Sequence, residues 1–151
     1  MVAEFQGFAR DLHDLTAEAL VLGSGAALES QPLLINAATA NRQMDSGNAD
    51  LGSLRKDFGR LGMVRYGERL ERLDAKWSVD KGVYQKLIEL RNALAHGNQS
   101  QLDVIRSREG GSDSLSATKK RLPNLNRMAR AMDRASWDHV NESVGQKPWG
   151  R

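Results

Sequence analysis

The chain contains no cysteine among its 151 residues. This absence excludes a disulfide framework, a zinc site built from thiolates and a cysteine nucleophile. It is compatible with a reducing cytoplasm, which is where we expect the protein to act. The sequence also lacks any apolar run of about eighteen residues. Its first turns already carry charged side chains, so we expect neither a membrane span nor a signal peptide: Glu4, Arg10, Asp11 and Asp14.

Neither sign of charge is in large excess, since the formal net charge is +3 at pH 7. This mild basicity permits nucleic-acid binding but does not argue for it. Apolar residues make up 40% of the chain and charged residues 27%. The length and composition suit one folded domain with a single core.

Apolar residues recur at spacings of three and four along most of the chain, the signature of amphipathic helices. We predict a first helix over residues 3–22 and a second from Pro32 to about Ser46. The apolar residues of these two helices are Phe5, Phe8, Leu12, Leu15, Ala19, Leu33, Leu34, Ala37, Ala38 and Ala40.

A third helix is predicted over residues 51–73, capped by Asp50. Internal glycines each cost about 1 kcal/mol relative to alanine, so we expect this helix to be kinked, broken or closely packed at Gly52, Gly59, Gly62 and Gly67.

A fourth helix is predicted to begin with Ser78 or Asp80 as its cap and to end at Gly97, a residue suited to a left-handed stop. Its expected buried stripe is Val83, Leu87, Leu90 and Leu94.

The segment 98–116 looks like a loop that is mobile in its latter half, around Gly110-Gly111, Ser112 and Ser114, with a short anchored turn at Leu102, Val104 and Ile105. A last helix begins near Ser116, where Pro123 either kinks it or marks its true first turn. The sequence therefore predicts an all-α up-and-down bundle of four to five helices over residues 1–142, with a frayed tail over 143–151.

One segment of the fourth helix combines groups suited to acid–base chemistry: Arg91-Asn92-Ala93-Leu94-Ala95-His96, followed by Gly97. Asn92 and His96 are four residues apart and project from one side of the helix, and the long side chain of Arg91 can curve toward them. Histidine suits proton transfer near neutral pH, and arginine offers a planar fork for phosphate oxygens. Asparagine can orient the histidine or bind the phosphate.

This motif resembles the hallmark of the HEPN superfamily of small helical proteins: Arg, then a polar residue, three more residues and His, late in a core helix. The resemblance implies a metal-independent ribonuclease whose Arg and His meet those of a second protomer in a dimer cleft. It also implies a toxin or antiphage role, with a neutralising antitoxin of nucleotidyltransferase type as the expected partner. The expected catalytic residues are Arg91, Asn92 and His96, with no metal and no cofactor.

Three other interpretations stand beside this one. Arg91 could pair with Glu89 or Asp103 while His96 serves as an ordinary helix cap. A HEPN fold could bind RNA or a nucleotide without cutting it. The chain could also be a helical adaptor outside the family.

The last predicted helix is basic, and such a stripe could hold RNA phosphates, although it could equally be a solvated face. Its candidate RNA-binding residues are Lys119, Lys120, Arg127, Arg130 and Arg134. A second basic series over residues 55–72 is interleaved with acids, which favours surface ion pairs instead. The other histidines form no metal-ligand pattern. We expect His13 at the surface or rim and His139 in a surface pair with Asp138.

Overall fold

The computed structural model describes residues 1–47, 49–109, 115–145 and 147–150. These residues form helices joined by short turns and contain no strand, so the predicted all-α bundle is confirmed. The helices are α1 (Val2–Gly23), the 3₁₀ turn η1 (Leu28–Ser30), α2 (Gln31–Thr39), α3 (Gln43–Ser46), α4 (Leu51–Arg60), α5 (Tyr66–Leu73), α6 (Trp77–Ala95), α7 (Gln99–Glu109), α8 (Leu115–Lys119) and α9 (Leu122–Val144).

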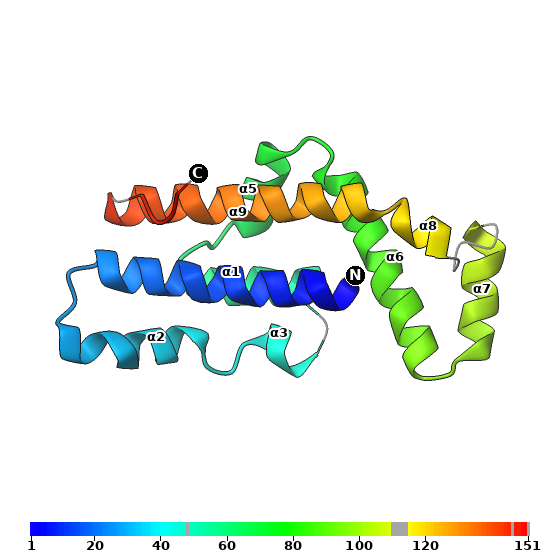
Figure 1. Ribbon diagram of the computed structural model, residues 1–151, viewed down its shortest axis with the longest axis horizontal. Helices are drawn as coiled ribbons and strands as arrows, with labels where there is room; N and C mark the ends of the chain where they lie inside the picture. The colour runs from blue at the N-terminus through cyan, green and yellow to red at the C-terminus, as the bar shows by residue number, and fades with distance from the viewer. Residues whose placement is uncertain (48, 110–114, 146, 151) are drawn as a thin grey trace.

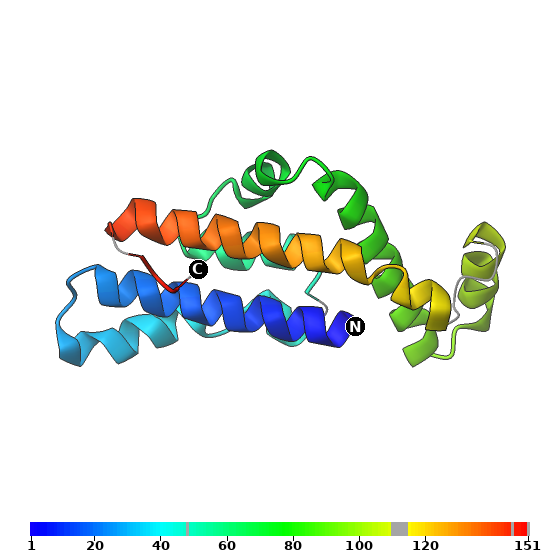
Figure 2. The same ribbon diagram turned by 45° about the horizontal axis from the view of Figure 1, so that its top comes forward.

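The long helices α1 and α9 lie side by side and run in the same direction (Figure 1). Their C-terminal ends meet where Val144 packs against Gly23, at a spacing that leaves no room for a Cβ atom on the glycine. Helix α2 folds back along α1, and α6 crosses near the start of α9. From there α6 continues past the bundle and pairs with α7 in a projecting hairpin (Figures 1 and 2).

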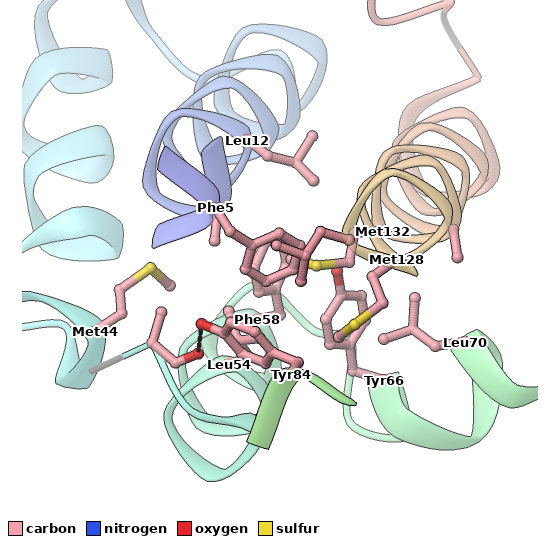
Figure 3. Packing of buried hydrophobic residues seen from close by; sticks show 14 of the residues in the cluster. Phe5, Leu12, Met44, Leu54, Phe58, Tyr66, Leu70, Tyr84, Met128 and Met132 are labelled. Atoms are coloured by element: carbon pink, nitrogen blue, oxygen red, sulfur yellow. Dashed lines mark hydrogen bonds between the residues drawn. The ribbon is translucent and has the colours of Figure 1, made fainter. Parts of the chain in front are cut away.

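The core lies between α1, α9 and the segment formed by α4, α5 and α6 (Figure 3). Phe5 of α1 meets Tyr84 of α6 with ring centroids 4.6 Å apart, and Phe58 stacks on Tyr66 at 4.5 Å. The Tyr84 hydroxyl donates to the Ala49 carbonyl oxygen at 2.8 Å, the dashed line in Figure 3. This bond satisfies the one polar atom that the ring brings into the core.

The predicted third helix is broken as expected. Asp50 caps α4 by accepting the Ser53 amide at 2.7 Å. The chain then turns at Gly62, whose φ of 86° is a conformation that favours glycine, and restarts as α5.

The predicted second helix is also two pieces. It stops at Thr39, passes Asn41 at a φ of 54°, and resumes as the short α3. None of the α2 residues is buried, and Leu33 and Leu34 are 69% and 42% exposed. The apolar pattern of α2 therefore predicted a helix correctly but does not mark a core face.

The prediction of a loop after Gly97 was wrong over residues 99–109, because these residues form α7. Leu102 and Ile105 of α7 pack on Leu90 and Ala93 of α6. Because α7 covers this face, Leu94 points away and is 56% exposed, against the prediction that it is buried. Residues 110–114, the glycine-rich part of the predicted loop, lie outside the described residues.

Neither Ser78 nor Asp80, the two predicted caps, lies at the N-terminal end of α6. The helix starts earlier, at Trp77, after Asp74 accepts the Lys76 amide at 2.8 Å. Asp80 is fully buried in the first turn instead and binds α9. Pro123 lies in the first turn of α9, one of the two alternatives left open for it.

The predicted boundary at residue 142 falls within the last turn of α9, which ends at Val144 with Gly145 in the left-handed conformation, φ 69°. Beyond Gly145, the Trp149 ring donates to Asp133 at 3.1 Å, and the Trp137 ring donates to the Trp149 carbonyl oxygen at 3.1 Å. These contacts hold Trp149 beside α9.

Candidate active site at the end of helix α6

The helix that carries the Arg-Asn-x3-His motif ends where the sequence predicts. Gly97 has a φ of 60°, and two backbone bonds close the last turn: Asn98 to Ala93 at 2.9 Å and Gly97 to Leu94 at 3.3 Å. This is a Schellman turn, in which glycine occupies the left-handed position. The turn fixes His96 as the C-terminal cap residue of α6.

The three motif residues share the exposed end of α6. Arg91 and His96 are exposed and Asn92 is half-buried. The Arg91 guanidinium donates to the Asn92 side-chain oxygen at 3.3 Å, and the His96 amide donates to the Asn92 carbonyl oxygen at 3.0 Å. An arginine, an amide and an imidazole therefore lie within one and a half helical turns on an accessible surface.

The hairpin that presents the motif has its own small core of Leu90, Ala93, Leu102 and Ile105. Asn98 caps α7 by accepting the Gln101 amide at 3.1 Å. The connection between α6 and α7 is thus defined at both helix ends. The motif stands on a helix end that is packed on one face and open on the other.

The main hollows in the described part of the chain lie elsewhere, and Arg91, Asn92 and His96 line none of them. Two apolar side chains of the hairpin are also exposed, Leu94 at 56% and Val104 at 45%. A single copy of the chain thus offers the motif on an open surface with uncovered apolar groups nearby.

The predicted RNA-binding arginines lie together on α9 but have different surroundings. Arg127 forms a bidentate ion pair with buried Asp80. Its Nε lies 2.8 Å from Oδ2, and its Nη2 binds Oδ1. These hydrogen bonds raise the pKa of Arg127. Arg134 pairs with Asp138 at 2.9 Å, and both Arg134 and Arg130 are exposed. The three arginines line a hollow of about 180 Å³ next to Leu73 and Asp74.

This basic hollow is distant from the motif along α6. Arg127 contacts α6 at Asp80, and His96 follows 16 residues later, which corresponds to about 24 Å of helix. The structure therefore does not bring Arg127 and His96 together. Lys119 and Lys120 are exposed at the end of α8, which lies between α7 and α9 in Figure 1.

The other two histidines do not lie where the sequence predicted, His13 at the surface or rim and His139 in a surface pair with Asp138. His13 is fully buried, and its Nε2 donates to the Asp57 carbonyl oxygen at 3.1 Å. Burial is the main cause that lowers its pKa. His139 is half-buried and bonds the Leu61 carbonyl oxygen at 2.8 Å, while Asp138 pairs with Arg134. Spacing could have revealed His13, because it is four residues from both Ala9 and Ala17 on the buried face of α1.

A buried polar network that the sequence analysis missed surrounds α3. The Asp57 carboxylate accepts the amides of Gln43 and Met44 at 3.0 and 2.9 Å, at the N-terminal end of α3. At the other end, the Gln6 side chain donates to the carbonyl oxygens of Met44 and Gly47. Sequence spacing gives no sign of these contacts, since the partners are far apart in the chain. We call this set of residues the α3 network.

Within the described residues, no three His, Asp or Glu side chains are grouped as metal ligands, and no helix has the length and apolarity to cross a membrane. No protein-family model matches the chain, and neither a curated protein nor a solved structure matches it.

Proposed function

We propose that this chain is a metal-independent endoribonuclease of the HEPN type, with Arg91, Asn92 and His96 as its catalytic residues. The observation that carries the proposal is the grouping of these three side chains at the exposed, Schellman-closed end of α6. RNA cleavage by its own 2′-hydroxyl needs a base, an acid and a cation for the charged phosphorane. Arg91 supplies the cation, and the His96 imidazole can act as base or acid.

In the proposed reaction, the His96 imidazole takes the proton of the 2′-hydroxyl as the 2′-oxygen attacks the adjacent phosphorus. The bond from phosphorus to the 5′-oxygen breaks, and a second, protonated imidazole gives its proton to that oxygen. Arg91 binds the phosphate oxygens, where charge accumulates in the transition state. Asn92 orients Arg91 or the phosphate. The products are a 2′,3′-cyclic phosphate and a 5′-hydroxyl.

This reaction favours a homodimer, because it uses two proton-transfer groups and one chain supplies one at the site. His13 is buried in the core, and the ring of His139 is engaged by Leu61. The second imidazole would be His96 of the partner subunit. The exposed Leu94 and Val104 are apolar groups on the same hairpin that a second copy could cover.

The proposed biological role is that of a toxin or antiphage effector, acting on RNA and held in check by an antitoxin. A nucleotidyltransferase-type protein is the partner that the HEPN resemblance suggests. Lys119, Lys120 and Arg130 are exposed cations that we propose bind RNA phosphates. Arg127 and Arg134, which the sequence also nominates, would have to share their guanidinium groups with Asp80 and Asp138.

A second candidate is a non-catalytic HEPN module that binds RNA or a nucleotide. The open surface around the motif in a single chain favours this alternative, because catalysis requires the reacting groups to be fixed and shielded from water. It predicts that RNA binding depends on Arg91 but that no cleavage occurs.

The deciding experiment incubates total tRNA and an mRNA with purified protein in EDTA and maps the product ends. Wild type should cleave and leave cyclic phosphate and 5′-hydroxyl ends, whereas Arg91→Ala and His96→Ala should not. Arg65→Ala is the matched control, because Arg65 is exposed on another element and carries no proposed role. No cleavage by wild type, with intact RNA binding, would favour the non-catalytic module.

Light scattering tests the dimer separately. We expect a mass of twice the 16.7 kDa chain. A monomer that still cleaves RNA would refute the composite site while leaving the ribonuclease proposal intact.

A further inference from the structure

A cavity of about 540 Å³ opens between α4, α5 and the first half of α6, on a part of the molecule that the proposed cleavage reaction does not use. Its volume lies within the range of about 300 to 1,000 Å³ that is typical of small-molecule sites. Its apolar lining comes from Leu51, which is half-buried, and from the small exposed edges of core side chains that are otherwise buried: Leu54, Tyr66, Leu70 and Trp77.

Glycines on two facing helices leave this space open. Gly67 of α5 and Gly82 of α6 both line the cavity. A Cβ atom added to Gly82 would meet nothing within 4 Å. A side chain at that position could therefore extend into the space, and the absence of one keeps the cavity accessible.

The charged groups at the cavity differ in whether they have partners. Lys81 lies 3.4 Å from Glu71, and Glu68 lies 3.9 Å from Arg65. Arg55, which also lines the cavity, forms no ion pair with any described residue. A Cβ atom added to Gly67 would lie 3.6 Å from the Arg55 Cδ and Nε atoms, so the arginine lies along the bare backbone of α5.

We propose that this cavity binds a small apolar molecule that carries one carboxylate. The apolar body would contact half-buried Leu51 and the small exposed edges of Leu70 and Trp77, and the carboxylate would pair with Arg55. An arginine fork binds a carboxylate through charge-assisted hydrogen bonds, and the apolar walls strengthen this contact by excluding water. A cationic ligand would find both carboxylates of the lining already next to a cation, Glu71 beside Lys81 and Glu68 beside Arg65.

Naphthalene-2-carboxylate is a suitable probe, because the neutral naphthalene-2-carboxamide and the cationic 2-naphthylmethylammonium have the same apolar body. Affinity is measured by calorimetry, and the backbone amide resonances of Gly67 and Gly82 report where the probe sits. With wild-type protein we expect the carboxylate to bind at least about tenfold more tightly than the carboxamide, as one charge-assisted hydrogen bond would give. In Arg55→Gln this preference should disappear.

Filling the cavity provides the second arm of the test. Gly82→Phe should weaken binding of the carboxylate by at least about tenfold, as expected when the apolar body is displaced. Gly7→Phe is the matched control, because a Cβ atom at Gly7 of α1 also meets open space and Gly7 does not line the cavity. If Gly82→Phe does not fold, the comparison of carboxylate with carboxamide in wild type and Arg55→Gln still decides.

The proposal is overturned if none of the probes binds, if the carboxamide binds as well as the carboxylate, or if Gly82→Phe binds as wild type does. None of these outcomes depends on RNA cleavage, so this site and the proposed active site are tested independently.

Discussion

The α3 network and the α6 motif are both clusters of polar side chains, yet their surroundings are opposite. Asp57 is 1% exposed, and its carboxylate is engaged by the amides at the start of α3. Arg91 and His96 are exposed at the end of a projecting hairpin. Buried polar groups must be satisfied by the protein and so are committed to holding elements together. Exposed groups on a fixed helix end remain accessible to a substrate. Burial therefore separates residues that hold the fold from residues available for chemistry.

The comparison predicts that the largest loss of stability comes from the α3 network. Asp57→Ala leaves two α3 amides without their acceptor and should lower the free energy of unfolding by about 3 kcal/mol. Urea denaturation measures this change. Asp103→Ala, an exposed carboxylate on α7, should stay within about 0.5 kcal/mol of wild type. Equal effects of the two substitutions would contradict the assignment of Asp57 as a structural residue.

A smaller and local loss is expected in the hairpin. Leu102→Ala removes most of a side chain that is 6% exposed and should cost about 2 kcal/mol, the lower end for leucine truncation, because the small cluster can partly collapse. Hydrogen exchange should accelerate in α7 and the end of α6 but not in α1 or α9. Gln101→Ala, at an exposed position of α7 with no proposed role, is the control. Faster exchange throughout the molecule would show that the hairpin is not a separate unit.

The pH dependence of stability should reveal the buried histidine. Because the folded-state pKa of His13 is lowered from 6.5, the unfolded state takes up its proton first as the pH falls. Stability from His13 is therefore fully present above about pH 6.5, the unfolded value, and declines below it toward the folded-state pKa. His13→Gln should flatten this part of the profile in urea titrations at pH 7.5, 6.5 and 5.5. An unchanged profile in the variant would assign the pH dependence to other groups.

The sequence predicted elements whose determinants are local. The stop at Gly97, the cap at Asp50 and the break at Gly62 each follow from the backbone preference of one residue or its nearest neighbours. For the same reason the motif residues were correctly expected at the end of a helix. These features need no knowledge of what packs against them.

Features that depend on tertiary partners could not be predicted in this way. Leu94 follows the spacing of a buried stripe but is exposed, because α7 covers the neighbouring face that contains Leu90 and Ala93. Helix α7 was missed since, among its side chains that the structure describes, only Leu102 and the partly buried Ile105 pack on α6, too few for a periodic signal. Aspartate is a common helix cap, so Asp80 was expected to cap α6. Its actual partner, Arg127, lies 47 residues away, and sequence spacing does not indicate this contact.

We propose that the exposed end of α6 serves chemistry and not stability. The most direct test measures RNA cleavage and the free energy of unfolding on the same preparation of His96→Ala. The account predicts a loss of cleavage of at least about 100-fold, the lower range for removing a general acid–base group. It also predicts an unfolding free energy within about 0.5 kcal/mol of wild type. Retained cleavage, or a loss of cleavage that merely follows a loss of stability, would contradict it.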